Sequence, residues 1–158
     1  MEFGWINLIN AIAVAYLIIV NVIAFKMGVA HDMKSKSKAV NALEQTGRYG
    51  CMALMILPVV KNFSFGFKTD KEFVVWMFVT PIILLIYGNV WLAMGVLKKQ
   101  DSKILLLLLA ILPVCLFVLN GILLRHLLLV VVAVLFGIFH LWIVWENYLG
   151  KDSRNDNF

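Results

Sequence analysis

Long apolar runs alternate with short polar segments along the whole chain. Five runs of 19–25 residues can be marked, and charged or turn-forming residues bound each of them. Their ranges are about 5–25, 49–67, 73–97, 104–124 and 127–149. An α-helix needs roughly 20 apolar residues to cross the hydrocarbon core of a bilayer. Because lipid offers no hydrogen-bond partners to a free backbone, each run should form a helix.

The pattern predicts an all-α integral membrane protein with five transmembrane helices. They form a single domain over residues 1–150, followed by a polar tail at 151–158. The second run is the weakest, because only twelve uncharged residues separate Arg48 from Lys61 and Pro58 lies among them. Four spans with a short re-entrant second segment are therefore the alternative. We favour a full span, with Lys61 reaching toward the surface.

Composition indicates that lipid, rather than water, surrounds most of the side chains. Hydrophobic residues make up 63% of the 158 residues, and the mean hydropathy is +0.93. Soluble proteins contain about 45–50% apolar residues, and so short a soluble chain has too little interior for the excess. The net charge of +5 comes mainly from residues at the ends of the runs. Such residues set topology and contact anionic headgroups, so the bilayer, and not nucleic acid, is the expected partner.

The distribution of lysine and arginine favours an N-terminus outside and a cytoplasmic C-terminus. With five spans in this orientation, ten basic residues face the cytoplasm and four face outside. The best four-span arrangement gives nine against five. The first run should be retained as a helix, because the acidic start Met1-Glu2-Phe3 lacks the basic segment of a signal peptide. We therefore expect a multi-pass plasma-membrane protein.

Cysteines and histidines give no sign of a disulfide, a metal or a cofactor. Cys51 and Cys115 should lie at depths that differ by roughly 12 Å, at about 1.5 Å of rise per residue. A disulfide needs Cα atoms within about 7 Å of each other. His31, His126 and His140 have no second His or Cys at ligand spacing. We expect no metal site and no cofactor.

Polar side chains inside the apolar runs carry most of the functional information, because a bilayer makes them costly. In the first run, Asn7, Asn10 and Asn21 fall on one face of a helix. That face should look into the protein, where asparagines hydrogen-bond between helices or contact a ligand.

In the fifth run, Gly137, His140 and Asn147 share a stripe that small residues accompany. Glu146 lies off this stripe near the cytoplasmic boundary, as Arg48 does on the second run, and we predict that the two form an ion pair. Such a pair would either serve a function or only lock two helices together. The candidate polar cluster in the cytoplasmic half consists of Asn21, Glu44, Arg48, Asn89, His140, Glu146 and Asn147.

Two features of the third run fit this prediction poorly. Asn89 lies opposite the face that carries Thr80, Tyr87 and Trp91, so both faces cannot line one cavity. In addition, Trp76 and Tyr87 lie within the run, whereas aromatic belts form at the membrane boundaries.

Two segments carry a family resemblance. The first runs from Asn41 to Cys51, includes Glu-Gln-Thr-Gly-Arg-Tyr-Gly, and continues to a Leu-Pro pair at Pro58. The second runs from Ile111-Leu112-Pro113 through Arg125 to His140 and Tyr148. Together they cover about half of the chain. They resemble a group of small, uncharacterised membrane proteins of low-GC Gram-positive bacteria, in which a Glu-Gln-x-Gly-Arg-aromatic-Gly motif opens the second hydrophobic segment. The resemblance implies a bacterial plasma membrane and no particular activity.

These observations leave three classes of function. The polar cluster favours binding or transport of a small molecule or lipid through a cytoplasmic-side polar cavity. The small soluble mass favours the alternative, a non-catalytic accessory, immunity or anchoring subunit, whose partners are other membrane proteins or further copies of the chain. An intramembrane enzyme is least favoured, because paired carboxylates and Ser–His patterns are missing, and we assign no catalytic residue.

Overall fold

The computed structural model describes residues 7–28, 35–57, 69–96 and 102–149, and these residues form helices without a strand among them. This confirms the predicted all-α fold with five helices. The π-helical turn η1 extends the fifth helix toward the C-terminus. The elements are α1 (Leu8–Lys26), α2 (Lys38–Ile56), α3 (Asp70–Val96), α4 (Lys103–Leu123), α5 (Leu127–Val144) and η1 (Trp145–Leu149).

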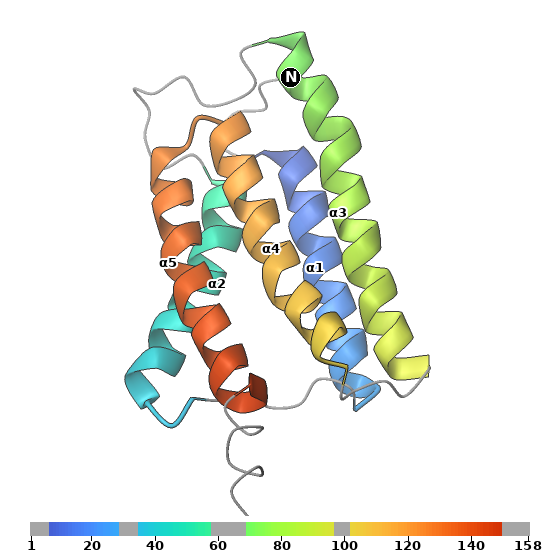
Figure 1. Cartoon of the computed structure of the whole chain (residues 1–158). Coiled ribbons are helices and arrows are strands. Elements are labelled where there is room, and N and C mark those ends of the chain that lie inside the picture. Colours follow the sequence, from blue (N-terminus) through green and yellow to red (C-terminus); the bar gives the residue numbers. More distant parts are fainter. Residues whose placement is uncertain (1–6, 29–34, 58–68, 97–101, 150–158) are drawn as a thin grey trace, which may run out of the picture.

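The five helices close into a bundle in which each helix touches two or more others. α5 packs against α2 and α4, α4 against α3, α3 against α1, and α1 against α2. Successive helices run in alternate directions, so α1 and α3 are parallel to each other (Figure 1). A backbone hydrogen bond of 2.9 Å from Asn7 N to Ile56 O ties the start of α1 to the end of α2.

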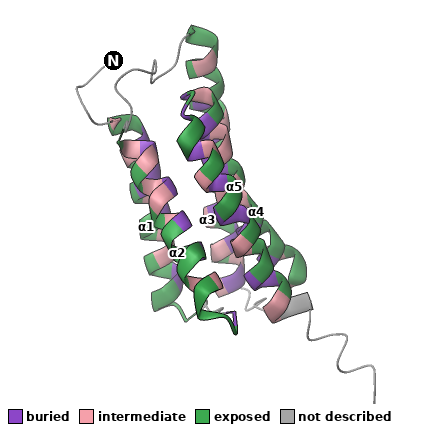
Figure 2. Cartoon of the chain, turned by 90° about the vertical axis from the view of Figure 1, so that its left-hand side faces the viewer, coloured by how far each residue is buried: buried purple, intermediate pink, exposed green. Residues whose placement is uncertain are grey.

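Four of the helices are long and apolar enough to cross a membrane, namely α1, α3, α4 and α5 with the first residues of η1. Their outward faces carry large apolar side chains, among them Phe25, Phe78 and Leu127, which are 60–74% exposed. Buried residues gather on the faces that look into the bundle (Figure 2). Such an outer surface suits contact with hydrocarbon, and the chain is a multi-pass membrane protein.

α2 differs from the predicted second span. It begins at Lys38 and not at Tyr49, while residues 58–67 of the prediction lie outside the described residues. Ser37 caps its start by accepting a hydrogen bond from Val40 N. The helix continues through Glu44 and Arg48 because these charged side chains find partners within the bundle, which a count of apolar residues cannot foresee.

Glycines bring α5 close to both of its main neighbours. A Cβ atom at Gly47 of α2 would lie 2.9 Å from Phe136 Cβ and 3.2 Å from Phe136 Cα. On the other side, a Cβ at Gly137 would lie 2.8 Å from a methyl group of Val114 in α4. Small residues at such contacts let membrane helices approach closely and gain van der Waals energy.

A tight turn joins α4 to α5. His126 N donates to Gly121 O at 2.8 Å and Arg125 N to Ile122 O at 3.0 Å, which is the Schellman arrangement that ends many helices. Arg125 occupies the left-handed position with φ 55°, where glycine is usual. His126 then caps the start of α5, because its Nδ1 atom accepts a hydrogen bond from Leu129 N at 3.1 Å.

Candidate functional site

A cluster of charged side chains lies between α2 and α5, made of Glu44, Arg48 and His140. The Glu44 side chain is only 4% exposed, and its Oε1 atom lies 2.9 Å from His140 Nδ1. The same oxygen is in contact with Nη2 of Arg48, one turn further along α2. Arg48 is less buried, with 36% of its side chain exposed. The structure therefore brings together three of the residues predicted for the polar cluster.

Local packing explains why these side chains meet. Glu44 and Arg48 are four residues apart on one helix, the spacing at which opposite charges pair. The close contact of Gly47 with Phe136 sets the register between α2 and α5. His140 lies one turn beyond Phe136, and their rings stack with centroids 4.9 Å apart, which fixes the imidazole opposite Glu44.

The cluster continues across the bundle to α3 and α1. Arg48 lies close enough to the Tyr87 hydroxyl of α3 to interact with it electrostatically. Tyr87 donates a hydrogen bond of 2.8 Å to Asn21 Oδ1 of α1, and the Asn21 amide donates to Leu17 O at 2.7 Å. Asn21 therefore belongs to the same polar region. The sequence signal for Tyr87 was a tyrosine within an apolar run, away from the expected aromatic belt.

The predicted ion pair between Arg48 and Glu146 is wrong. Glu146 instead accepts hydrogen bonds from Ser35 Oγ at 2.6 Å and from Lys36 N at 3.3 Å. The helix register accounts for the difference. Gly47 packs on Phe136, so Arg48 lies about ten residues, or roughly 15 Å, from Glu146 along α5. Glu146 therefore fixes the segment before α2 to the end of α5.

The other two predicted members are held by their own helices. Asn147 donates to Ile143 O at 2.8 Å. Asn89 is exposed and donates to Leu85 O at 2.8 Å, on the outer side of α3, as its position opposite Thr80 indicated. Neither hydrogen bond reaches Glu44 or His140.

Further polar contacts lie toward the other end of the bundle. Trp76 Nε1 donates to Asn120 Oδ1 at 2.7 Å, which explains the second aromatic residue within the third run. Arg125 pairs with Glu72 at 2.9 Å. Burial lowers the pKa of His126 below its usual value, and this outweighs a backbone hydrogen bond that acts in the opposite direction.

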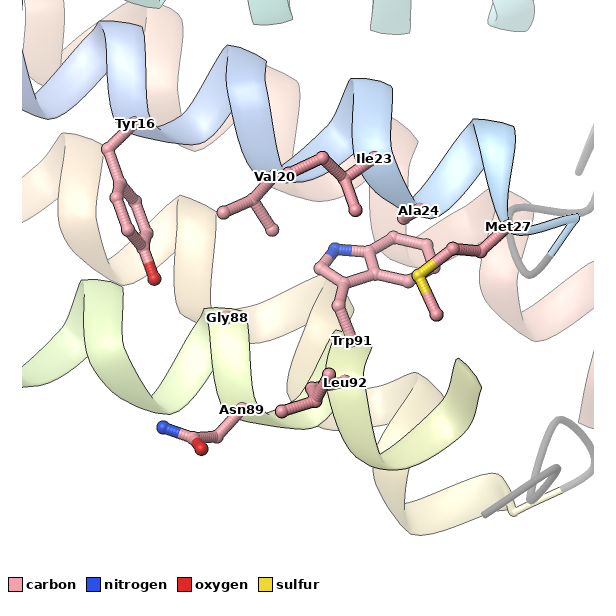
Figure 3. A pocket seen from close by; sticks show the side chains of 9 residues that line it. All are labelled: Tyr16, Val20, Ile23, Ala24, Met27, Gly88, Asn89, Trp91 and Leu92. Carbon is pink, nitrogen blue, oxygen red and sulfur yellow. The ribbon is translucent and has the colours of Figure 1, made fainter. Parts of the chain in front are cut away.

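A groove with a volume of about 280 Å³ lies between α1 and α3. The Tyr16 hydroxyl reaches across to Gly88, and the Trp91 indole is directed toward α1, while the Asn89 amide points away (Figure 3). Gly88 makes room for Tyr16, because a Cβ atom there would overlap the phenol oxygen. The lining residues are Tyr16, Val20, Ile23, Ala24, Met27, Gly88, Asn89, Trp91 and Leu92.

The cysteines and acidic residues form no further site in the part of the chain that the structure describes. Cys51 is buried and Cys115 exposed, and both are free thiols. No three His, Cys, Asp or Glu side chains of these residues gather closely enough to hold a metal ion.

Fold and site together define a small polytopic helical membrane protein with a charged cluster inside its bundle and an apolar groove on its surface. Comparisons with protein-family models, with curated proteins and with solved structures find no match to the chain.

Proposed function

We propose that this is a lipid-binding protein of the bacterial plasma membrane that holds an acyl chain of an anionic phospholipid between α1 and α3. The groove between these helices is the observation that carries the proposal. Its volume of about 280 Å³ lies just below the range of ordinary ligand pockets, which measure about 300–1,000 Å³. A single hydrocarbon chain suits a space of this size.

The lining favours an apolar occupant over the polar solute that the sequence analysis also allowed. Val20, Ile23, Met27 and Leu92 provide aliphatic and thioether surface. The charged residues Glu44 and Arg48 are not part of the lining. α1 and α3 are both candidate membrane spans, so hydrocarbon surrounds the groove in a bilayer.

The end of α1 favours an anionic headgroup. Lys26 is exposed and adjoins Met27, which lines the end of the groove. In the orientation favoured by the basic residues, this is the cytoplasmic end, where anionic lipids attract lysine and arginine. An acyl chain in the groove would place its phosphate near this ammonium group.

Photolabelling in nanodiscs tests the proposal. The nanodiscs contain phosphatidylcholine with a trace of phosphatidylglycerol that carries a photoactivatable group in one acyl chain. We expect crosslinks in the segments around Met27 and Leu92, and a several-fold loss of labelling in Val20→Trp, because the indole fills the groove. Val22→Trp is the matched control, since Val22 is exposed on the same helix outside the groove. Equal labelling of both variants, or crosslinks spread over all helices, would contradict the proposal.

A second candidate, a subunit of a membrane complex, is favoured by the outer face of α2. Gln45 and Thr46 are exposed there, and Tyr49 is 64% exposed. Polar side chains that face hydrocarbon find no partners, whereas a neighbouring helix can supply them. α2 itself is not among the helices apolar enough to span a membrane by composition.

Native electrophoresis in mild detergent tests this second candidate. Ala42→Trp should disrupt close helix packing on the exposed face of α2 and lower the mass of the native complex. Ala15→Trp, on the exposed face of α1, should leave the mass unchanged. A wild-type mass equal to that of one chain in its detergent micelle would eliminate the candidate.

A further inference from the structure

The Glu44 carboxylate is the centre of a buried site that can change its charge. It is enclosed between α2 and α5, and one of its oxygens contacts both Arg48 and His140. When the His140 imidazole is neutral and donates from Nδ1, the Glu44 carboxylate and the Arg48 guanidinium cancel each other, so the cluster has no net charge. Histidine is the side chain that ordinarily titrates between pH 5 and 8. One proton on Nε2 of His140 would give the cluster a charge of +1 without breaking a covalent bond.

The surroundings make His140 the group that would take up this proton. Nδ1 is engaged with Glu44, so Nε2 is the ring nitrogen left to take up a proton. On η1, Glu146 is bound to Ser35 and Lys36. Tyr87 on α3 interacts electrostatically with Arg48, and Cys51 is a buried thiol on α2.

We propose that His140 and Glu44 form a proton-binding site that increases the affinity of the α1–α3 groove for anionic phospholipid when it is protonated. This inference rests on the proposed function. The physical basis is the sign of the added charge, because a cation within the bundle attracts a phosphate that sits at the mouth of the groove.

Side-chain interactions connect the Glu44–His140 site with the α1–α3 groove. Arg48 interacts electrostatically with the Tyr87 hydroxyl of α3, and Tyr87 is hydrogen-bonded to Asn21 of α1, so the charge on α2 acts toward both walls of the groove. The Tyr87 ring also meets Trp91, a lining residue, edge to face with centroids 6.4 Å apart. When His140 is protonated, its charge competes with that of Arg48 for Glu44, so Arg48 is held less strongly and its positive charge is freer to act toward α3. Linkage is reciprocal, so bound anionic lipid would in turn favour the protonated state.

The same photolabelling, performed at pH 5.5 and pH 8, tests the inference. Phosphatidylglycerol is a suitable probe because its phosphodiester stays charged throughout this range. We expect the labelling of the wild-type groove to show that phosphatidylglycerol binds about fivefold more tightly at pH 5.5 than at pH 8. His140→Gln should show the same labelling at both values, and photoactivatable phosphatidylcholine should show no pH dependence in either protein.

Two further measurements test whether the proton binds at His140 and Glu44. Glu44→Gln removes the carboxylate that stabilises the imidazolium, so the midpoint of the labelling curve should move to lower pH. In wild-type protein with ¹⁵N-labelled imidazoles, the His140 resonance, assigned by elimination with His31→Gln and His126→Asn because the chain has three histidines, should titrate between pH 5.5 and 8. If Glu44→Gln or His140→Gln fails to fold, this titration still decides.

Failure of the proton site and failure of the lipid groove give different results. Labelling that Val20→Trp abolishes but that is independent of pH would overturn the proton site and leave the lipid groove intact. A His140 resonance that does not titrate would do the same. Labelling that is insensitive to Val20→Trp would overturn the groove itself, and the inference with it.

Discussion

At the scale of single residues, the contact of Gly47 with Phe136 has the largest consequences. It sets how α2 and α5 lie against each other, and thereby which side chains meet across their interface. The sequence already indicated Glu44, Arg48 and His140, because His140 is a polar residue inside an apolar run and Glu44 and Arg48 stand directly before one. Their pairing could not be predicted, since the periodicity of one helix says nothing about its register against another. For this reason, Glu146 was expected beside Arg48 but binds Ser35.

Substitution of this glycine should destabilise the bundle. A Cβ atom at Gly47 would lie 3.2 Å from the Cα atom of Phe136, so backbone as well as side chain must move. We expect Gly47→Ala to cost about 1–3 kcal/mol of folding free energy, the usual range for overpacked cores. Gly50→Ala is the matched control, because its new Cβ would meet Val132 at an ordinary 3.5 Å. Thermal unfolding in detergent compares the two, and equal melting temperatures would contradict the expected role of Gly47.

At the scale of helices, the apolar runs predicted α1, α3, α4 and α5 to within a few residues at each described end. α2 was misplaced because its first half is polar, and a polar helix can enter the bundle only where neighbouring helices supply partners. Helix boundaries in the other cases follow from local signals. The start of α5 is an example, since the neutral ring of His126 caps it by accepting a hydrogen bond from Leu129 N.

The cap on α5 should make folding stability depend on pH. Burial lowers the pKa of His126 in the folded protein, so the unfolded chain binds this proton more tightly. The stabilisation is therefore fully present above the unfolded-state pKa of about 6.5 and is lost as the pH falls below that value toward the folded pKa. His126→Asn keeps a side-chain acceptor and removes this titration. We expect the variant to lose less stability than the wild type between pH 7.5 and 5.5, measured by chemical unfolding in detergent. Parallel losses would show that other groups cause the dependence.

At the scale of the whole molecule, two features on different sides of the bundle account for the proposals. The charged cluster lies within the contact of α2 and α5, and the apolar groove lies between α1 and α3. The groove could not be predicted from sequence, because it depends on which two parallel helices become neighbours and on the room that Gly88 leaves for Tyr16. An all-α membrane protein, in contrast, follows from composition and run length alone.

The amphipathic composition of α2 also constrains how the chain is assembled during synthesis. Glu44 and Arg48 would each oppose insertion of an isolated helix by about 2.5–3.5 kcal/mol. Besides Arg48 on the same helix, the partner of Glu44 is His140, which the ribosome adds almost a hundred residues later. We therefore expect α2 to remain at the headgroup layer, or to stay shielded by the translocon, until α5 has been synthesised. Insertion of the second helix into the bundle is then expected to follow synthesis of the fifth, and not to take place in the order of the sequence.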